Sequence, residues 1–341
     1  NDSDYSYTVR KNIIDNICCS VQLPSDLYID DEGKLLVRAT ISMRESYDLL
    51  AETNDVNEWK SVYVFGGASA ITIECLSEVV STGSQVHLFG RRTYERIEDK
   101  IDDVFNINDL QKYVLSNETD SKKDLATLRS RIHFLQSQIE LSSAIRRLNS
   151  RGASVHYHKC DITSLDDVKG ALLEVEAQGG AKPSSVLFSA GTLRDALMTK
   201  MSKDDFTEVV EVKCHGLNNV LEFCPFEECH SIYVFGSVSG TYGNKGQVNY
   251  SAANEGLFRL AKIFSENKKE LKTVVFNWGP WGEVGMAEPE VNEQFAKRGI
   301  TPLTTQQGVS CFLYATKLKA SGFHSPVCGF APWNDLEETF N

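Results

Sequence analysis

From residue 61 onward, short apolar runs alternate with segments of helical periodicity, and this alternation constrains the fold more than any other feature. The runs lie at 61–67, 85–92, 154–161, 184–191, 231–237 and 272–279, with helical patterns between them. Apolar runs that recur between helices predict parallel strands, because each return to the same edge of a sheet needs a crossover. We expect an α/β fold with a doubly wound parallel sheet and helices on both faces.

One interval is longer than a simple crossover needs. About 60 residues separate the second and third runs, where a crossover takes far fewer. Within this interval Leu125, Leu128, Ile132 and Leu135 begin a stripe with three-to-four spacing, which predicts a long amphipathic helix that stops at Gly152. We expect a helical insertion at about 93–139 in an otherwise Rossmann-like domain. Packing explains the apolar stripe better than ligand binding does.

Residues 1–60 do not follow the alternation. The stretch LYIDDEGKLLVRATI allows a hairpin that turns at Asp31-Glu32-Gly33. We expect residues 1–60 to be a flanking or truncated structural subdomain and residues 61–341 to be the principal domain. The sequence has no initiator methionine and begins with polar residues, so it reads as a piece of a longer chain or as a processed form.

The net charge and the cysteine pattern limit the classes of partner, the cellular location and the metal sites that this chain can have. The formal net charge over 341 residues is −12, which argues against a nucleic-acid backbone as the main partner. No window approaches the roughly 18 apolar residues of a membrane span. The 9 cysteines form no CxxC pair, and no Cys/His pair with ligand-like spacing is accompanied by a second such pair. We therefore expect reduced thiols, a cytoplasmic location and no metal site.

The stretch FGSVSGTYGNKGQVNYSAANEGL, residues 235–257, carries the clearest chemistry. Ser237 ends an apolar run, and a helix predicted from about Gln247 places Tyr250 and Asn254 one turn apart on one face. A hydroxyl, a phenol and an amide can thus point into one cleft. A phenol with a pKa of about 10 is a poor acid or base at neutral pH without a nearby cation. Lys213, in VEVKCHG, is the candidate for that cation.

The segment FGGASAIT after the first apolar run is a candidate phosphate-binding turn. Glycines in such a turn let the backbone approach a pyrophosphate at a helix N-terminus. Of the usual three glycine positions only the first, Gly66, holds glycine, and Ala70 and Thr72 take the other two. A tight strand–helix turn without a ligand is the alternative interpretation.

Three further features lie where a dinucleotide would need them. Arg91 and Arg92 close the second run, where arginine suits a ribose 2′-phosphate and therefore NADPH rather than NADH. Solvated surface arginines are the alternative. Asp161 ends the third run, where its carboxylate could accept from the adenine amino group. Small residues at 189–191 end the fourth, where a ribose could lie against the backbone.

The blocks GGASAIT, FGRR, CDIT, SAGTLRD, VKCHG, SVSG, YGNKGQVNYSAAN and NWGPW together resemble a known family. They are similar to the ketoreductase domain of polyketide synthases and polyunsaturated-fatty-acid-synthase-like megasynthases, within the short-chain dehydrogenase/reductase superfamily. The resemblance covers residues 61–315, approximately. Most short-chain dehydrogenases carry lysine four residues after the tyrosine. This sequence has Asn254 there and Lys213 earlier, as these ketoreductases do.

The resemblance implies NADPH-dependent reduction of a β-ketoacyl thioester carried by the phosphopantetheine group of an acyl carrier protein. Neighbouring domains of a multifunctional enzyme of polyketide or fatty acid biosynthesis are the other implied partners. It implies Tyr250 as proton donor, Ser237 as the hydroxyl that holds the substrate carbonyl, and Lys213 and Asn254 as their support. The implied cofactor contacts are Gly66, Gly67, Ala68, Ser69, Ala70, Ile71, Arg91, Arg92, Cys160, Asp161, Ile162, Ser189, Ala190, Gly191, Lys213, Tyr250, Trp278, Gly279 and Pro280. The implied substrate and lid residues are Leu193, Tyr242, Gln247, Trp281 and Met286.

Two other functions stay open. One is a stand-alone short-chain dehydrogenase acting on a free ketone, against which the YSAAN arrangement argues. The other is a non-reducing, structural ketoreductase-like domain, which Ala70 in the glycine loop favours and the retained catalytic set disfavours. Buried packing is the alternative role for Trp278 and Trp281. Leu193-Arg194-Asp195 resembles the LDD motif of members that give a D-hydroxyl product, with the middle acid replaced, so we expect that product.

Overall fold

The computed structural model describes residues 27–29, 35–37, 59–95, 110–112, 114, 125–284, 297, 299–317 and 321–329. The chain divides into two compact units, 1–50 with 331–341 and 51–330. In the first unit β1 (Leu27–Ile29) pairs antiparallel with β2 (Leu35–Val37). This pairing confirms the strands of the predicted hairpin, whose turn lies outside the described residues. The boundary expected at residue 60 stays a prediction.

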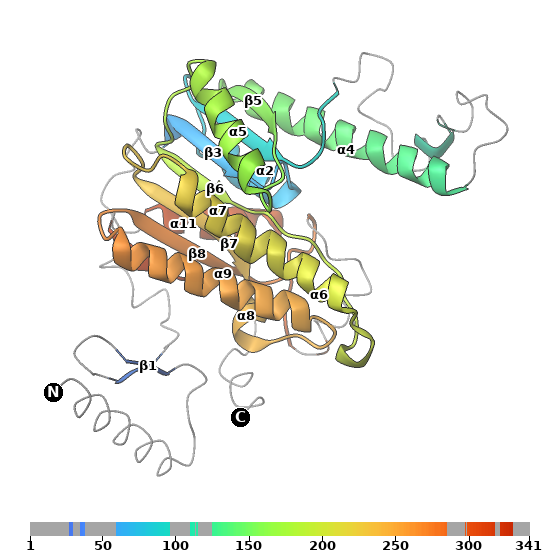
Figure 1. The fold of residues 1–341 in the computed structure, drawn as a ribbon, viewed down its shortest axis with the longest axis vertical. Coiled ribbons are helices and arrows are strands. Elements are labelled where there is room, and N and C mark those ends of the chain that lie inside the picture. The colour runs from blue at the N-terminus through green and yellow to red at the C-terminus, as the bar shows by residue number, and fades with distance from the viewer. Residues whose placement is uncertain are drawn as a thin grey trace, which may run out of the picture. The chain divides into compact units, whose positions relative to one another are not determined.

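The second unit is built on a parallel sheet (Figure 1). The strand order is β10-β8-β7-β6-β3-β4-β5, and β9 also pairs with β8. The strands are β3 (Ser61–Phe65), β4 (Gln85–Gly90), β5 (Ser154–Lys159), β6 (Ser185–Phe188), β7 (Ser231–Ser237), β8 (Lys272–Trp278), β9 (Gly322–His324) and β10 (Val327–Cys328). All the predicted strands are present, and the order reverses at β3, which confirms the doubly wound arrangement.

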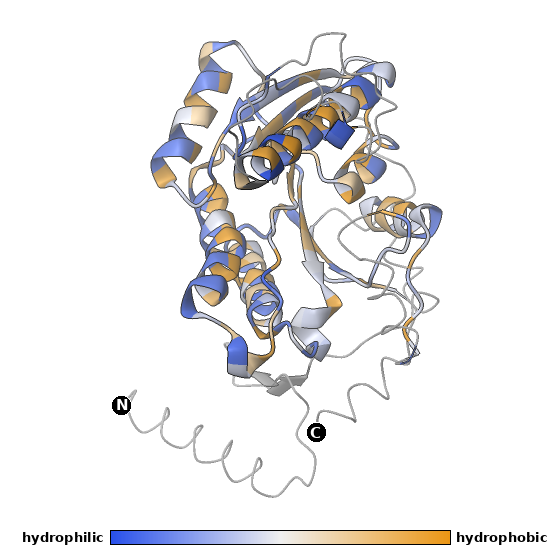
Figure 2. Cartoon of the chain, turned by 90° about the vertical axis from the view of Figure 1, so that its right-hand side faces the viewer, coloured by the Kyte–Doolittle hydropathy of each residue, from blue (hydrophilic) through white to orange (hydrophobic). Residues whose placement is uncertain are grey.

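The described helices flank this sheet. They are α2 (Ala70–Leu76), α4 (Leu125–Ser150), α5 (Leu165–Ala177), α6 (Lys203–Val210), α7 (Gly216–Phe223), α8 (Val238–Tyr242), α9 (Val248–Asn267) and α11 (Thr305–Thr316), with a 3-10 turn η4 (Met198–Lys200) and a π-helical turn η5 (Glu211–His215). On one side α7 contacts α5 and α9, and on the other α2 contacts α4 and α11. Figure 2 shows hydrophobic and hydrophilic residues alternating along the helices, as is typical of helices with one apolar side. No helix in the described ranges is both long and apolar enough to cross a bilayer.

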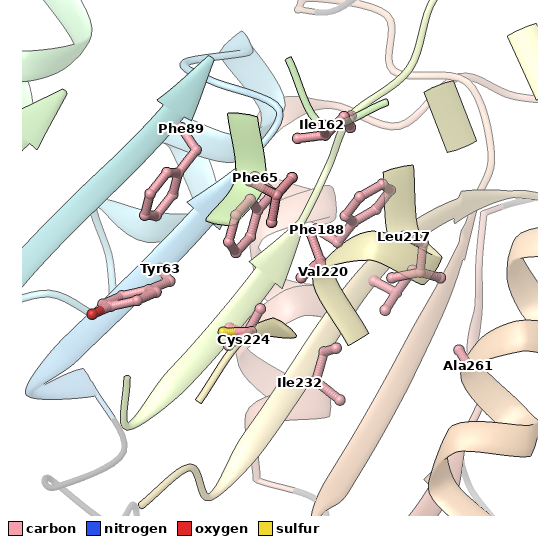
Figure 3. Packing of buried hydrophobic residues seen from close by; sticks show 14 of the residues in the cluster. Tyr63, Phe65, Phe89, Ile162, Phe188, Leu217, Val220, Cys224, Ile232 and Ala261 are labelled. Carbon is pink, nitrogen blue, oxygen red and sulfur yellow. The ribbon is translucent and has the colours of Figure 1, made fainter. Parts of the chain in front are cut away.

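The two faces of the sheet bury different side chains, because successive residues of a strand point in opposite directions. Tyr63 and Phe65 of β3 belong to the core cluster that α5, α7 and α9 cover (Figure 3). On the other face Phe312 of α11 packs against Tyr233 of β7, with ring centroids 5.8 Å apart, and against Phe276 of β8 at 5.5 Å. The sheet is therefore buried on both faces, as its continuous apolar runs predict.

The interval between β4 and β5 contains the predicted long helix, α4. Leu135 of its apolar stripe is buried in one cluster with Leu110 and Val114, and Leu128 and Ile132 pack against that cluster, which confirms the packing role. Residues 96–109, 113 and 115–124 of the expected insertion lie outside the described residues.

Two elements differ from expectation. The stretch TIECLSEVVSTG after the first apolar run predicts a helix that ends at Gly83, but α2 ends at Leu76. There the Ser77 hydroxyl donates to the Ile73 carbonyl at 2.6 Å, a local bond that competes with continuation of the helix. The edge formed by β9 and β10 was not predicted, because strands of three and two residues are too short to show a period.

Candidate active site

A cavity of about 370 Å³ opens where β3, β4, β5 and β6 end. Carboxyl ends of parallel strands, at the point where the strand order reverses, are the usual ligand site of such sheets. The predicted cofactor residues that line the cavity are Gly66, Gly67, Ala68, Ser69, Arg91, Arg92, Cys160, Asp161, Ile162, Ala190 and Gly191. The structure thus brings together residues from four separate loops.

The glycine turn is fixed by its neighbours. The N–H groups of Gly66 and Gly67 both donate to the Phe89 carbonyl, at 3.1 and 2.9 Å. Gly66 has φ +118°, and a Cβ on it would lie 2.4 Å from the Ala190 nitrogen. Only glycine fits a backbone this close to its neighbour, so the turn after β3 and the loop after β6 meet beside the cavity. Ala70 and Ile71 begin α2 and are not among the residues that line the cavity.

Polar groups surround the far end of the cavity. Arg91 and Arg92 directly follow β4 and are exposed. Within the described ranges neither guanidinium has an ion-pair partner, so both are available to an anion. The Asp161 carboxylate accepts from the N–H and hydroxyl of Thr163, at 3.0 and 2.7 Å. Ser189 does not line the cavity, and its N–H donates to the Phe65 carbonyl at 2.8 Å.

The sequence interpretation missed the contribution of α4 to this cavity. The unpredicted lining residues are Phe89, Gly90, Ser137, Gln138, Glu140, Leu141, Tyr157, Thr192 and Val212. A length argument could have found the helix residues. β5 has 6 residues, about 20 Å, and a helix needs roughly 13 residues to run back over that length. Counting back from the end of α4 at Ser150 reaches Ser137, where the helix passes the carboxyl edge.

Ser237 stands at the end of β7 with its hydroxyl oriented. Its oxygen accepts from the Ser239 N–H at 3.2 Å and from the Ser239 hydroxyl at 3.0 Å. A hydroxyl has one proton and two lone pairs. Because Ser239 occupies the acceptor positions, the proton of Ser237 is left to be donated. Ser239 is a supporting residue that the sequence interpretation did not identify.

Tyr250 and Asn254 lie one turn apart on α9, as predicted. The Asn254 side chain donates to the Tyr250 carbonyl at 2.8 Å, and its Oδ1 is buried without a partner in the described part of the chain. Burial raises the pKa of the Tyr250 phenol, while hydrogen bonds to the side chains of Asn254 and Ser237 lower it, and the nearby Asp195 carboxylate raises it. The net direction is upward, so the phenol is protonated at neutral pH.

Lys213 occupies the π-helical turn η5, between α6 and α7. Its side chain is 3% exposed, and its Nζ donates to the Phe235 carbonyl at 3.2 Å and lies 5.5 Å from the centroid of the Tyr250 ring. Gly256 lets α9 approach this turn, because a Cβ there would lie 2.6 Å from Cys214 Sγ. The packing of η5 on α9 therefore brings the lysine to the tyrosine, although 37 positions separate them.

The catalytic residues adjoin the cavity without lining it. Gly191 makes the connection, because a Cβ on it would meet Lys213 Cε at 3.3 Å and Nζ at 3.5 Å. A ligand that lies in the cavity can extend over Gly191 to the lysine.

Replacement of Lys213 by methionine is expected to stabilise the protein by about 3 kcal/mol at pH 7. Burial lowers the pKa of Lys213 from 10.5 to about 8, and one pKa unit corresponds to about 1.4 kcal/mol. Below pH 8 Lys213 is protonated in the folded protein, and keeping that buried charge lowers the free energy of unfolding. Between pH 8 and 10.5 the unfolded chain binds more protons, so wild-type stability rises with pH and the difference from Lys213→Met shrinks.

Urea unfolding at pH 7 and pH 9.5 measures this difference. The exposed Lys245 provides the control, since Lys245→Met should change the unfolding free energy little at either pH. Equal stability of Lys213→Met and wild type at pH 7 would contradict the assigned burial cost.

Side-chain hydrogen bonds connect the two segments that carry the predicted substrate residues Leu193 and Gln247. Gln247 donates to the Asp195 carboxylate at 2.7 Å, and the buried Asn249 donates to the Arg194 carbonyl at 2.8 Å while accepting from the Tyr250 N–H at 2.8 Å. The loop after β6 is therefore fixed to the start of α9. Leu193 lies partly exposed in that loop, and Tyr242 is buried at the end of α8. Met286 lies outside the described residues.

Trp278 and Trp281 are buried in an aromatic layer rather than in the cavity. Trp278 stacks on Phe276 at 5.0 Å, and the two tryptophan rings meet edge-on at 5.2 Å. Both indole Nε1 atoms are buried without a partner in the described ranges. Gly279 donates to the Cys328 carbonyl at 2.8 Å, and neither Gly279 nor Pro280 lines the cavity. Contact of this segment with a cofactor stays a prediction.

Comparison with protein families identifies the family to which a chain with this site belongs. The model of the KR domain family matches residues 61–283. The chain belongs to the KR domain family. As a KR domain it is an oxidoreductase that acts on a ketone, a chemistry for which this family uses a nicotinamide cofactor. The match includes every residue of the predicted catalytic set.

Relatives of this KR domain are large synthases. It is 28% identical over 256 residues to a polyunsaturated fatty acid synthase chain of Thraustochytrium sp., covering 72% of this chain and 9% of that protein. It is 25% identical over 189 residues to polyketide synthase PksN of Bacillus subtilis, covering 53% of this chain and 3% of that protein. The KR domain thus spans less than a tenth of the length of these curated relatives.

Solved structures support the fold of the KR domain. The ketoreductase from the first module of phoslactomycin biosynthesis in Streptomyces sp. HK803 matches with a TM-score of 0.62 at 20% identity, over 83% of this chain and 55% of that one. A ketoreductase domain from the bacillaene assembly line matches with a TM-score of 0.61 at 21% identity, over 86% of this chain and 61% of that one.

Proposed function

We propose that this KR domain reduces a β-ketoacyl thioester on an acyl carrier protein to the β-hydroxyacyl thioester, with NADPH, within a polyketide or fatty acid synthase. The observation that carries the proposal is the position of the buried Lys213 beside the Tyr250 ring, 5.5 Å from its centroid, with the Asn254 amide donating to the Tyr250 carbonyl. A domain with a purely structural role has no need for a buried cation next to a phenol. The relatives, which are named as synthases, support the setting in an assembly line.

The cavity fits the proposed cofactor. Gly66 lines the cavity at a point where a Cβ would clash with the Ala190 backbone, and Ala190 and Gly191 are small enough for a ribose to lie against them. Arg91 and Arg92 suit a 2′-phosphate, and Asp161 suits the adenine amino group. Bound NADPH would supply the hydride. Ala70 does not line the cavity, so its methyl group gives the structural alternative no support.

The catalytic side chains supply the proton and hold the carbonyl. Ser237 donates to the carbonyl oxygen, because Ser239 already occupies its acceptor positions. Tyr250, protonated at neutral pH, donates its proton to the developing alkoxide. The positive charge of Lys213 stabilises the phenolate that remains. These donors are in place before the reaction, so little reorganisation is needed in the transition state.

Neighbouring residues keep this arrangement. Asn249 fixes the first turn of α9 to the loop after β6, and the Gln247–Asp195 bond closes the same junction. The same loop carries Leu193-Arg194-Asp195, and from its resemblance to the LDD motif we propose that the product is the D-hydroxyl thioester. Chiral analysis of the reduced thioester tests that preference.

A direct comparison of substrates tests the proposed function. We expect the domain to reduce a β-ketoacyl group on a carrier protein with at least about tenfold higher kcat/KM than the same acyl group on a short free thioester, because carrier contacts add binding energy. NADPH binding is followed by fluorescence titration. Faster reduction of a free ketone would favour a stand-alone dehydrogenase. Failure to bind NADPH would favour a structural domain.

A further inference from the structure

Side chains from outside β4 hold the segment that carries the two exposed arginines. Residues 91–95 leave the sheet after β4 without forming a helix or strand. Gln138 of α4 reaches this segment: its Oε1 accepts from the Glu95 N–H at 2.8 Å, and its Nε2 donates to the Thr93 carbonyl at 2.9 Å. Both polar atoms of one carboxamide are thus bonded to the backbone of one short loop.

Further contacts complete this attachment. The Tyr157 hydroxyl, from β5, donates to the Arg92 carbonyl at 2.6 Å. The hydroxyls of Tyr94 and Ser142 lie 3.4 Å apart, and the rings of Tyr94 and Tyr157 have centroids 5.8 Å apart. Each residue from Arg92 to Glu95 therefore contacts β5 or α4.

Burial makes Gln138 the strongest of these attachments. Its exposed fraction is 0%, whereas Thr93 and Glu95 are exposed. A buried carboxamide that lost its partners would be left unsatisfied, which costs more than a hydrogen bond between exposed groups contributes. Gln138 therefore holds residues 93–95 against α4. The same glutamine lines the cavity together with Arg91 and Arg92.

We propose that Gln138 is a positioning residue for recognition of the ribose 2′-phosphate. By fixing residues 92–95 to α4, it holds the backbone from which the guanidinium groups of Arg91 and Arg92 reach the cavity. Arginine side chains lose rotamer freedom when they bind a phosphate, and a mobile backbone beneath them would add to that loss. The inference rests on the proposed use of NADPH. NADH has no 2′-phosphate, so its binding should depend little on Gln138.

Binding measurements on the whole chain test the proposal. Gln138→Met keeps the length of the side chain and removes both polar atoms. By calorimetry we expect Kd to rise about tenfold for adenosine 2′,5′-bisphosphate and NADPH, and less than about twofold for 5′-AMP and NADH. Gln136, on the same helix, is the matched control, since its amide donates to Glu140 at 3.1 Å and, within the described ranges, forms no hydrogen bond with residues 91–95. Gln136→Met should leave all four affinities unchanged.

A second measurement asks whether Gln138 acts through the arginines. In a variant that carries Arg91→Ala and Arg92→Ala, the further change Gln138→Met should weaken adenosine 2′,5′-bisphosphate binding less than about twofold. Additive losses would overturn the proposal, as would equal weakening of the phosphorylated and unphosphorylated probes. Retained binding of 5′-AMP shows that the variant is folded. Wild-type protein that binds adenosine 2′,5′-bisphosphate no more tightly than 5′-AMP would overturn the use of NADPH itself, a result visible without any Gln138 variant.

Discussion

Replacing Tyr250 with phenylalanine is expected to lower the rate of ketone reduction by about 10³-fold, within the range that general acid catalysis contributes. The change removes only the hydroxyl. The ring that lies 5.5 Å from Lys213 Nζ remains, so the lysine keeps its position. NADPH affinity should change little, because the lining of the cofactor cavity does not include Tyr250. Steady-state kinetics on the carrier-bound substrate, with NADPH titration of the same variant, measures both effects.

Tyr63 supplies the control for this prediction. It is a buried tyrosine of β3 whose hydroxyl donates to the Ala181 carbonyl at 3.1 Å, and it does not line the cavity. Tyr63→Phe should retain most of the activity. Unchanged turnover in Tyr250→Phe would remove the tyrosine from the mechanism, whereas equal losses in both variants would point to a structural effect.

Gly66→Ala is expected to destabilise the protein by about 3 kcal/mol or more, because backbone strain and steric overlap add at this position. The residue has φ +118°, and the new Cβ would lie 2.4 Å from the Ala190 nitrogen and 2.7 Å from the Ser189 carbonyl carbon. These are backbone atoms of the loop after β6 and cannot move aside as a side chain can. NADPH affinity should fall with stability, since the same turn lines the cavity. Urea unfolding and cofactor titration measure the two losses.

Gly83→Ala separates strain from overlap. Gly83 also has a positive φ, +91°, but no heavy atom lies within 4 Å of the position that a Cβ would take there. Its replacement should cost only the backbone strain, about 1 kcal/mol. Similar losses in the two variants would show that the approach of β3 to the loop after β6 is looser than the structure indicates.

The sequence was sufficient for the fold of the second unit wherever periodicity extends over enough residues. The apolar runs that became β3 to β8 are long enough to identify as strands, and α4 shows its period over several turns. The failures were short elements. β9 and β10 are too brief to show alternation, and α2 ends early because the Ser77 hydroxyl bonds to a helix carbonyl.

The spacing of Ser237, Tyr250 and Asn254 could also be predicted, because all three lie on one strand–loop–helix unit whose geometry is local. Lys213 was assigned to them because a phenol needs a nearby cation and because the sequence resembles a family, not from any spacing along the chain. Its approach to Tyr250 depends on a π-helical turn and on the contact between Gly256 and Cys214, and neither leaves a sequence pattern. The two tryptophans show the opposite case. Their residue type fitted a pocket, but Trp278 packs against Phe276 and Trp281 packs against Trp278, and both are buried.

The sequence by itself determined the strands of the sheet, the loops that follow them and the chemical groups that those loops carry. It could do so because strand period, helix period and local spacing depend only on residues close together in the chain. Only the tertiary structure decided how the distant groups meet. It placed Gln138 against the arginine loop, gave Ser237 two donors that orient its hydroxyl, and buried Lys213 beside a phenol. Such contacts depend on how closely whole elements approach one another, and side-chain packing sets that distance.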